Sequence, residues 1–275
     1  MQLKKLLIAT SLSAIIASLT AVFPVLAEDG QPHNIYEVAL AWKNTAAEYE
    51  ALYYQGFNIA RYHVDRYLAN HPESTKKLAI ISDLDDTLLS PQAFWLEMMK
   101  QNSEFFDDPL WDRLIADYTL KATPGSLEFA NYVKDNNIEI FYVSSRNQDD
   151  EAKTNEYAIE QLKRLGFPYA DAEHVKILMD SSNKEEIQAE IEKDYHVIVK
   201  LGDNLNDFNR SFYTKSISER KQITQDQKDK FGTEYVLFPN PTDGHWVRAI
   251  FGDSEPQKSD ENLQKWREAA EGKLE

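Results

Sequence analysis

Four short runs of apolar residues, each followed by polar residues, mark the chain downstream of residue 76. Runs of four to eight apolar residues with turn-forming residues at their ends are typical of buried β-strands. The four predicted strands cover 78–81, 138–143, 197–201 and 235–238. The stretches between them are predicted to be helices, at about 126–134, 151–165 and 183–193. This alternation predicts an α/β fold, a Rossmann-like and mainly parallel sheet flanked by helices.

Residues 34–70 carry a different pattern. From Ile35 to Tyr67 the steps between successive apolar positions are three or four residues throughout, which is the period of one helix face. Gly56 is the expected place for a bend or a division. The stripe predicts an amphipathic helix that covers the core. Two more specific interpretations of the stripe are a dimer contact and a wall of a substrate cleft.

The first 27 residues have the order of a secretory signal peptide. Lys4 and Lys5 precede the uncharged, apolar stretch 6–23, and slim residues at Val25 and Ala27 follow it. An uncleaved membrane anchor is the alternative, because the stretch is nearly long enough to span a bilayer. We expect cleavage near Ala27 and a bacterial protein that is periplasmic or secreted.

Within the expected mature chain, residues 28–275, we predict one domain. Its parts are a small helical cover segment at 34–70, an α/β core at 76–252 and a charged C-terminal helix at 254–275.

The net charge and the lack of cysteine exclude several classes of function. The chain has 30 basic and 46 acidic residues, a net charge of −16, and removal of two lysines with the signal deepens it to −18. A chain this acidic is a poor partner for nucleic acids, whose phosphates attract clustered Lys and Arg. With no cysteine, disulfides, thiolate nucleophiles and lipidation through cysteine are excluded.

The first predicted strand ends in three closely spaced carboxylates, Asp83, Asp85 and Asp86. Their mutual repulsion would be costly without a cation, and carboxylate oxygens suit Mg²⁺. Residues two apart on an extended segment point to the same side, so Asp83 and Asp85 can approach one site, one as nucleophile and one as acid and base. A calcium-binding loop is the weaker alternative, because Leu88 and Leu89 interrupt its ligand pattern.

Other strand ends add polar groups. The third strand ends in Gly202-Asp203 with Asp207 four residues later, and the second ends at Ser144. In open α/β sheets, ligands bind outside the carboxyl ends of the strands. Lys184 lies at a predicted helix start, where the helix dipole does not favour a cation, and this misfit hints at a separate role.

In this order, the motifs Asp83-x-Asp85-x-Thr87, Ser144, Lys184 and Gly202-Asp203 with Asp207 resemble the haloacid dehalogenase superfamily of phosphohydrolases. A closer resemblance is to the bacterial class C nonspecific acid phosphatases, which include the lipoprotein 5′-nucleotidases. It rests on six stretches, namely Ala39–Tyr54, Ala122–Gly125, Phe141–Ser144, Ser182–Lys184, Gly202–Phe208 and Pro239–Pro241.

The resemblance implies a haloacid dehalogenase fold and a mechanism. It implies that Asp83 attacks phosphorus to give an aspartyl-phosphate, and that Asp85 serves as acid and then as base. It implies Mg²⁺ held by the Asp83 carboxylate, the Asp85 backbone carbonyl and Asp203. The resemblance also implies roles for residues other than these aspartates. Thr87, Ser144 and Lys184 would bind the phosphoryl oxygens, and Asp207 would orient Lys184 or a metal-bound water.

The chain also departs from those relatives. It lacks the cysteine for a lipid anchor, its loop after Leu88 is shorter, and Asp243 stands where an aromatic residue is expected to stack on the leaving group. Trp95, Trp111 and Trp246 are the remaining candidates for that contact. Core packing is the alternative for each, and it is the preferred interpretation for Trp111.

The sequence therefore predicts a secreted, Mg²⁺-dependent acid phosphatase for small phosphomonoesters, with nucleoside monophosphates as candidate substrates. The alternatives are a phosphotransferase that uses the same intermediate and a non-catalytic periplasmic protein that binds phosphate ligands. No nucleic acid partner and no stable membrane anchor after signal cleavage are expected, and a homo-oligomer is left open.

Overall fold

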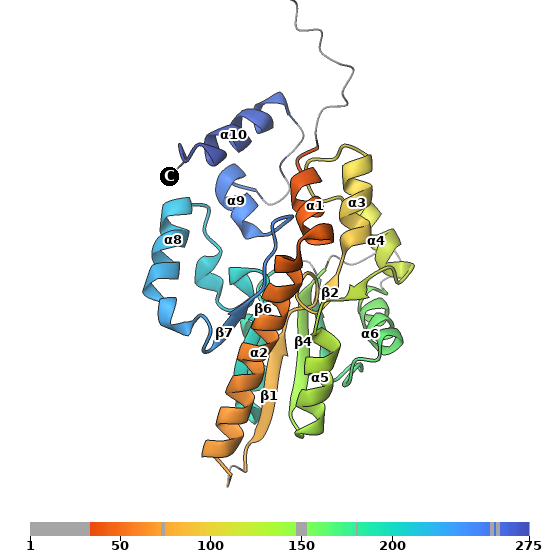
Figure 1. Ribbon diagram of the computed structural model, residues 1–275, viewed down its shortest axis with the longest axis vertical. Coiled ribbons are helices and arrows are strands. Elements are labelled where there is room, and N and C mark those ends of the chain that lie inside the picture. The colour runs from red at the N-terminus through yellow and green to blue at the C-terminus, as the bar shows by residue number, and fades with distance from the viewer. Residues whose placement is uncertain are drawn as a thin grey trace, which may run out of the picture. The chain divides into compact units, whose positions relative to one another are not determined.

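A computed structural model describes residues 34–72, 75–146, 153–179, 181–253, 256 and 259–274 of the chain (Figure 1). The predicted signal peptide, residues 1–27, lies outside the described residues.

The core is a parallel five-stranded sheet, as the sequence predicts. The strand order is β5-β4-β1-β6-β7. The strands are β1 (Lys77–Ser82), β4 (Glu139–Ser145), β5 (Val175–Leu178), β6 (Tyr195–Gly202) and β7 (Tyr235–Leu237). The sequence did not indicate β5, a four-residue edge strand; β2 (Leu89–Ser90) and β3 (Lys121–Ala122) form a separate two-stranded pair. Ser82 pairs with Tyr142 on one side and with Leu201 on the other, so the carboxyl ends of the three central strands lie together.

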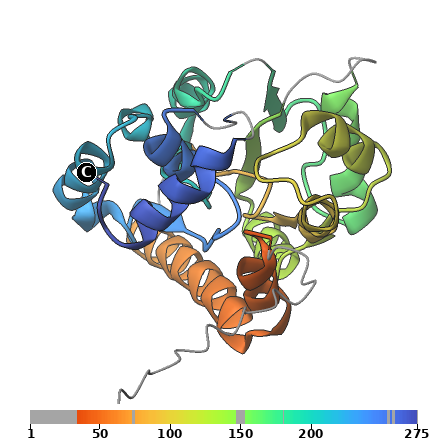
Figure 2. The same cartoon turned by 90° about the horizontal axis from the view of Figure 1, so that it is seen from above.

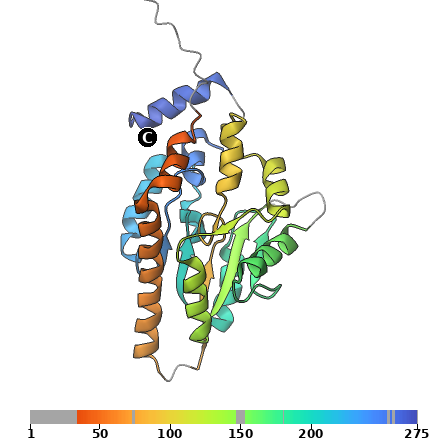
Figure 3. The same cartoon turned by 45° about the vertical axis from the view of Figure 1, so that its right-hand side comes forward.

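Both faces of the sheet are covered by helices. Along β1, Ile80 packs into the larger apolar cluster, whereas its neighbours Ala79 and Ile81 pack into a second cluster with Ile191. This alternation is that of a strand buried on both faces. Helices α2 (Ala47–Asn70) and α5 (Ser126–Asp135) lie over the first face (Figures 1 and 3). Helix α7 (Glu185–Asp194) supplies Ile191 to the second.

The N-terminal stripe forms two helices, and they are divided ten residues before the expected place. α1 (Glu37–Thr45) ends and α2 begins at Ala46, whose backbone is extended with φ −83° and ψ 120°. Gly56 instead lies inside α2 with Phe238 pressed against it. A Cβ at Gly56 would be 2.5 Å from Phe238 Cε1, so the glycine permits close packing of α2 on the end of β7.

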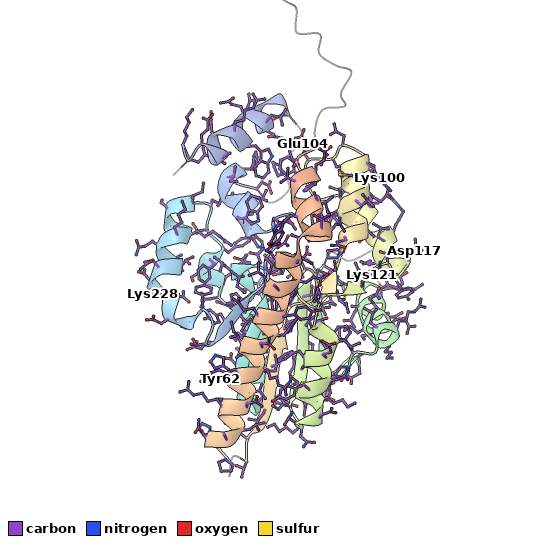
Figure 4. The ribbon with its side chains drawn as sticks, in the orientation of Figure 1. Tyr62, Lys100, Glu104, Asp117, Lys121 and Lys228 are labelled. Atoms are coloured by element: carbon purple, nitrogen blue, oxygen red, sulfur yellow. The ribbon has the colours of Figure 1, made fainter. Side chains whose placement is uncertain are left out.

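Helix α6 (Thr154–Leu165) packs beside β5 and adds Ala158 and Leu162 to the larger apolar cluster. Helices α3 (Gln92–Lys100), α4 (Asp108–Ala116), α9 (His245–Phe251) and α10 (Asp260–Ala270) lie beyond the carboxyl ends of the strands (Figures 1 and 2). Between β6 and β7 the chain forms the 3-10 turns η1 (Leu205–Asp207) and η2 (Arg210–Phe212), helix α8 (Ile217–Asp226) and the 3-10 turn η3 (Lys228–Lys230). Helix α10 is attached to the loop after α3, where Asn262 Nδ2 donates to Glu104 Oε2 at 3.2 Å (Figure 4). Among the helices of the described residues, none combines the length and the apolar character needed to span a bilayer.

Candidate active site

The carboxyl ends of the central strands open into a cleft of about 390 Å³. Asp83 follows β1, Ser144 lies near the end of β4 and Asp203 follows β6, and all three line the cleft. Helices α3, α4 and α9 supply the rim. The parallel sheet therefore brings together side chains that are up to 120 positions apart in sequence.

Lys184 lies between two carboxylates at the floor of this cleft. Its ammonium is 2.5 Å from Asp83 Oδ1 and 2.7 Å from Asp207 Oδ1, and all three residues are buried. Burial alone would lower the pKa of Lys184, but the charges of Asp207 and Asp83 outweigh it and raise that pKa above its usual value. Lys184, at the start of α7, therefore forms ion pairs with aspartates that follow the strands and does not stabilise the helix end.

A glycine makes the position of Asp207 attainable. A Cβ at Gly202 would be 2.4 Å from Asp207 Oδ2, closer than any tolerable contact. Asp207 Oδ2 also accepts a hydrogen bond of 2.9 Å from the Asn204 backbone N–H. The Gly-Asp-x-x-x-Asp spacing therefore folds the second aspartate back on to the end of β6.

Thr87 and Asn240 fix the other carboxylate oxygens. The buried Thr87 hydroxyl lies 3.2 Å from Asp83 Oδ2 and 3.4 Å from Asp203 Oδ1. Asn240 Nδ2 donates to Asp203 Oδ2 at 2.7 Å. Thr87 is directed at carboxylates rather than at the open cleft, whereas Ser144 lines the cleft itself.

Asp85 is held from the neighbouring strand. Arg146 donates from Nε to Asp85 Oδ2 and from Nη2 to Oδ1, each at 2.8 Å. The Ser144 hydroxyl lies 3.3 Å from the same Oδ2. Arg146 is buried and Asp85 is partly exposed to the cleft, so the pair presents an oriented carboxylate to a bound molecule.

The carboxylates at the cleft floor fit a divalent cation. Ligand atoms of Asp83, Asp203 and Asp207 lie within 4.8 Å of one another. Burial raises the pKa of Asp83 to about 7. The negative charges of Asp207 and Asp85 also raise this pKa, whereas the positive charge of Lys184 lowers it. Burial raises the pKa of Asp203 as well, reinforced by Asp207 and Asp83. One lysine does not balance this set, and oxygen donors of this kind suit a hard cation.

Comparison with known proteins identifies the family. Residues 19–246 match the model of the HAD superfamily, subfamily IIIB (acid phosphatase). The chain belongs to this family. A class C acid phosphatase from Bacillus anthracis, crystallised with tungstate bound, is 31% identical with a TM-score of 0.75, over 86% of this chain and 95% of that one. A second structure of the class C acid phosphatase from Bacillus anthracis is 32% identical with a TM-score of 0.75, over 84% and 94%. The chain is thus a phosphomonoester hydrolase with the haloacid dehalogenase fold.

In this acid phosphatase, Asp86 belongs to a different cluster from its neighbours. Its backbone has φ +55°, and its carboxylate accepts from Lys43 Nζ at 2.6 Å and from Trp95 Nε1 at 3.3 Å. The Tyr53 hydroxyl donates to its backbone carbonyl at 2.5 Å. Although Asp86 borders the cleft, Lys43 of α1 rather than Lys184 balances its charge.

The candidate tryptophans lie in different places. Trp111 is buried at the edge of the cleft, beneath the Arg146 guanidinium. Trp95 lines the cleft but is 2% exposed and packs on Tyr36, with ring centroids 5.2 Å apart. Trp246 lines a separate cavity of about 100 Å³, and its Nε1 donates to the Asp243 backbone carbonyl at 2.9 Å. Asp243 borders both the cavity and the cleft.

Three residues in contact with the predicted site were not assigned from the sequence. Arg146 and Asn240 each follow a strand, so their positions in the sequence could have marked them as residues at the carboxyl edge of the sheet. Lys43 carried no such signal, because it is one of many polar residues beside the helical stripe. The acid phosphatase therefore holds Asp83, Asp85, Asp86 and Asp203 with separate partners, which are Lys184, Arg146, Lys43 and Asn240.

Proposed function

We propose that the chain hydrolyses small phosphomonoesters with Mg²⁺ through an aspartyl-phosphate on Asp83. The observation that carries the proposal is the position of Asp83 on the floor of the cleft, in contact with Lys184 and close to Asp203. Family membership supports the hydrolysis of phosphomonoesters. The Mg²⁺ ion, the aspartyl-phosphate and the role of each residue go beyond what family membership supports.

Asp83 is proposed as the nucleophile. Its carboxylate attacks the phosphorus in line with the leaving oxygen, forming the phosphorus–oxygen bond as the ester bond breaks. Lys184 supplies positive charge beside the attacking oxygen and the phosphoryl group. The Thr87 hydroxyl, at 3.2 Å from Asp83 Oδ2, fixes the orientation of the carboxylate.

Asp85 is proposed as the acid and then the base. It gives a proton to the leaving alcohol in the first step and takes one from the water that hydrolyses the aspartyl-phosphate in the second. The two hydrogen bonds from Arg146 hold its carboxylate at the cleft. Ser144, which borders the cleft beside it, is placed to donate to a phosphoryl oxygen.

Asp83, Asp203 and the backbone carbonyl of Asp85 would hold Mg²⁺. When bound, the ion supplies the positive charge that allows ionised carboxylates to approach an anionic ester. Asn240 keeps Asp203 in place, and Asp207 keeps Lys184 in place.

We further propose that residues 1–27 direct export and are removed near Ala27. The apolar stretch flanked by Lys4, Lys5 and Ala27 supports this. The N-terminal mass of the protein recovered from the periplasm or the medium tests it; an N-terminus at Met1 would contradict it.

The proposal is tested by metal removal and return. Exhaustive chelation is expected to abolish turnover of p-nitrophenyl phosphate, and Mg²⁺ to restore it. An Asp203→Asn variant should need a higher Mg²⁺ concentration for half-maximal rate, because it loses one charged ligand. Full activity after chelation would contradict the metal role. Product analysis with added glycerol separates hydrolysis from phosphoryl transfer, since only transfer yields glycerol phosphate.

A further inference from the structure

One wall of the cleft collects cationic residues in an otherwise acidic protein. We call it the arginine wall, formed by η1, η2 and the starts of α8 and α9. Its members are Asn206, Arg210, Tyr213, Arg220, His245 and Arg248. Of these, Asn206, Tyr213 and His245 line the cleft, and the arginines lie behind them.

Two of the cleft-lining side chains on this wall have polar atoms with no hydrogen-bond partner among the described residues. Asn206 is 5% exposed, yet both its amide oxygen and its amide nitrogen are buried without a partner. His245 Nδ1 is likewise buried without a partner. An unsatisfied buried polar group costs free energy, so such groups beside a cleft point to a ligand that would satisfy them.

The guanidinium groups of the three wall arginines have no carboxylate within ion-pair distance among the described residues, although the Arg210 backbone N–H donates to Glu185 Oε1 at 2.9 Å. Their side-chain hydrogen bonds go to neutral groups: Arg210 Nη1 donates to Ser182 Oγ at 2.8 Å and Arg220 Nη1 to the Phe212 carbonyl at 2.5 Å. Arg210 and Arg248 lie over the Tyr213 ring, with guanidinium carbons 3.4 and 4.3 Å from its centroid. The Nε atom of Arg248 is buried without a partner.

The charge of the arginines reaches the cleft. Burial lowers the pKa of His245 to about 3, and the positive charges of Arg220, Arg210, Arg248 and Lys184 add to this effect. His245 is therefore neutral at working pH and can donate or accept at Nδ1. Asp243, two residues before His245, also lines the cleft, and burial raises the pKa of its carboxyl group to about 6.

We propose that the arginine wall binds a second anionic group, a carboxylate or a phosphate, on the leaving group of the substrate. The Asn206 amide and His245 would donate hydrogen bonds to it, and the arginines behind them would stabilise its charge. This inference rests on the proposed function, and it narrows the substrates to phosphate esters of acidic alcohols.

A matched pair of substrates tests the inference. 2-Phosphoglycerate and glycerol 2-phosphate differ only in a carboxylate that replaces a hydroxymethyl group. With the full chain and Mg²⁺, we expect kcat/KM to be about tenfold higher for 2-phosphoglycerate, the effect of one hydrogen bond to a charged group. The net charge of the chain alone predicts the opposite order.

Variants locate the effect. Arg248→Gln and Asn206→Ala should each lower the ratio of the two kcat/KM values about threefold or more. Arg164→Gln is the matched control, because Arg164 is exposed on α6, where it pairs with Glu160, and its loss should leave the ratio unchanged. If a wall variant fails to fold, the wild-type ratio can be followed from about 0.05 M to about 0.5 M KCl, over which screening should lower it.

The outcomes separate the two proposals. A ratio of one or less with both substrates turned over would overturn the inference and leave the proposed function intact. A raised ratio that survives both wall variants, or that salt leaves unchanged, would also overturn it. No turnover of either substrate or of p-nitrophenyl phosphate would remove the proposed function, and this inference with it.

Discussion

The buried guanidinium of Arg146 donates a hydrogen bond of 2.8 Å to each carboxylate oxygen of Asp85. Bidentate pairing fixes the plane of a carboxylate as well as its position. Arg146 itself packs over the Trp111 ring, with its guanidinium carbon 5.6 Å from the ring centroid. The arginine is thus a positioning residue for the proposed acid of the reaction.

Removing Arg146 should therefore impair proton transfer more than phosphate binding. We expect Arg146→Ala to lower kcat on glycerol 2-phosphate by about tenfold or more, a part of the total contribution of general acid catalysis. On p-nitrophenyl phosphate the loss should be smaller, because p-nitrophenolate leaves without a proton. Arg146→Lys should fall between wild type and Arg146→Ala, because lysine keeps the charge but not the fork. Steady-state kinetics on both substrates make the comparison, and equal losses on the two would show that Arg146 does not act through Asp85.

Lys43 and Asp86 form a buried ion pair beside the site, and breaking it should destabilise the fold. Both side chains are almost completely inaccessible. Lys43→Met leaves Asp86 buried and unpaired, which we expect to lower the free energy of unfolding by about 3–5 kcal/mol. The double variant Lys43→Met with Asp86→Asn should regain most of that loss, because no charge remains uncompensated.

Urea unfolding measures these differences. Lys228→Met, at an exposed position on η3 (Figure 4), is the control and should change the free energy of unfolding by less than about 0.5 kcal/mol. A double variant no more stable than Lys43→Met would contradict this account of the pair.

Glu139 links stability to pH at the far end of β4. Partial burial opposes its ionisation, but hydrogen bonds from Tyr195 and His174 outweigh this and hold the pKa of Glu139 below its usual value. A pKa that is lower in the folded state stabilises the fold above the unfolded-state pKa of about 4.3 and ceases to do so as pH falls through the folded value. The difference in free energy of unfolding between wild type and Glu139→Gln should therefore be largest near neutral pH and shrink below about pH 4.3. A constant difference across this range would refute the linkage.

Local sequence patterns sufficed for the sheet because each central strand is a run of buried apolar residues. They missed β5 because Val175–Leu178 is only four residues long and includes Lys176. They misplaced the helix division because Gly56 is accommodated by Phe238, whereas the break at Ala46 has no glycine or proline to announce it. Tertiary packing, not local preference, decides both positions.

The site was predictable as far as strand ends define it. Asp83, Asp203 and Lys184 were found because charge at the end of a buried strand, or at an unfavourable helix end, needs an explanation. Asn206 and Arg248 carried no such signal, since nothing in a sequence tells that a buried amide lacks a partner. Those residues required the three-dimensional arrangement.

The central claim is that Asp83 is the nucleophile, and the rate of p-nitrophenyl phosphate hydrolysis by Asp83→Asn tests it most directly. The variant should fold, because it removes one charge from a crowded set of carboxylates, and its thermal unfolding midpoint serves as the check. With Mg²⁺ present we predict that turnover is abolished, because a neutral amide lacks the nucleophilic carboxylate oxygen that forms the aspartyl-phosphate. Turnover within about tenfold of wild type, equivalent to only about 1.4 kcal/mol in activation free energy, would contradict the claim.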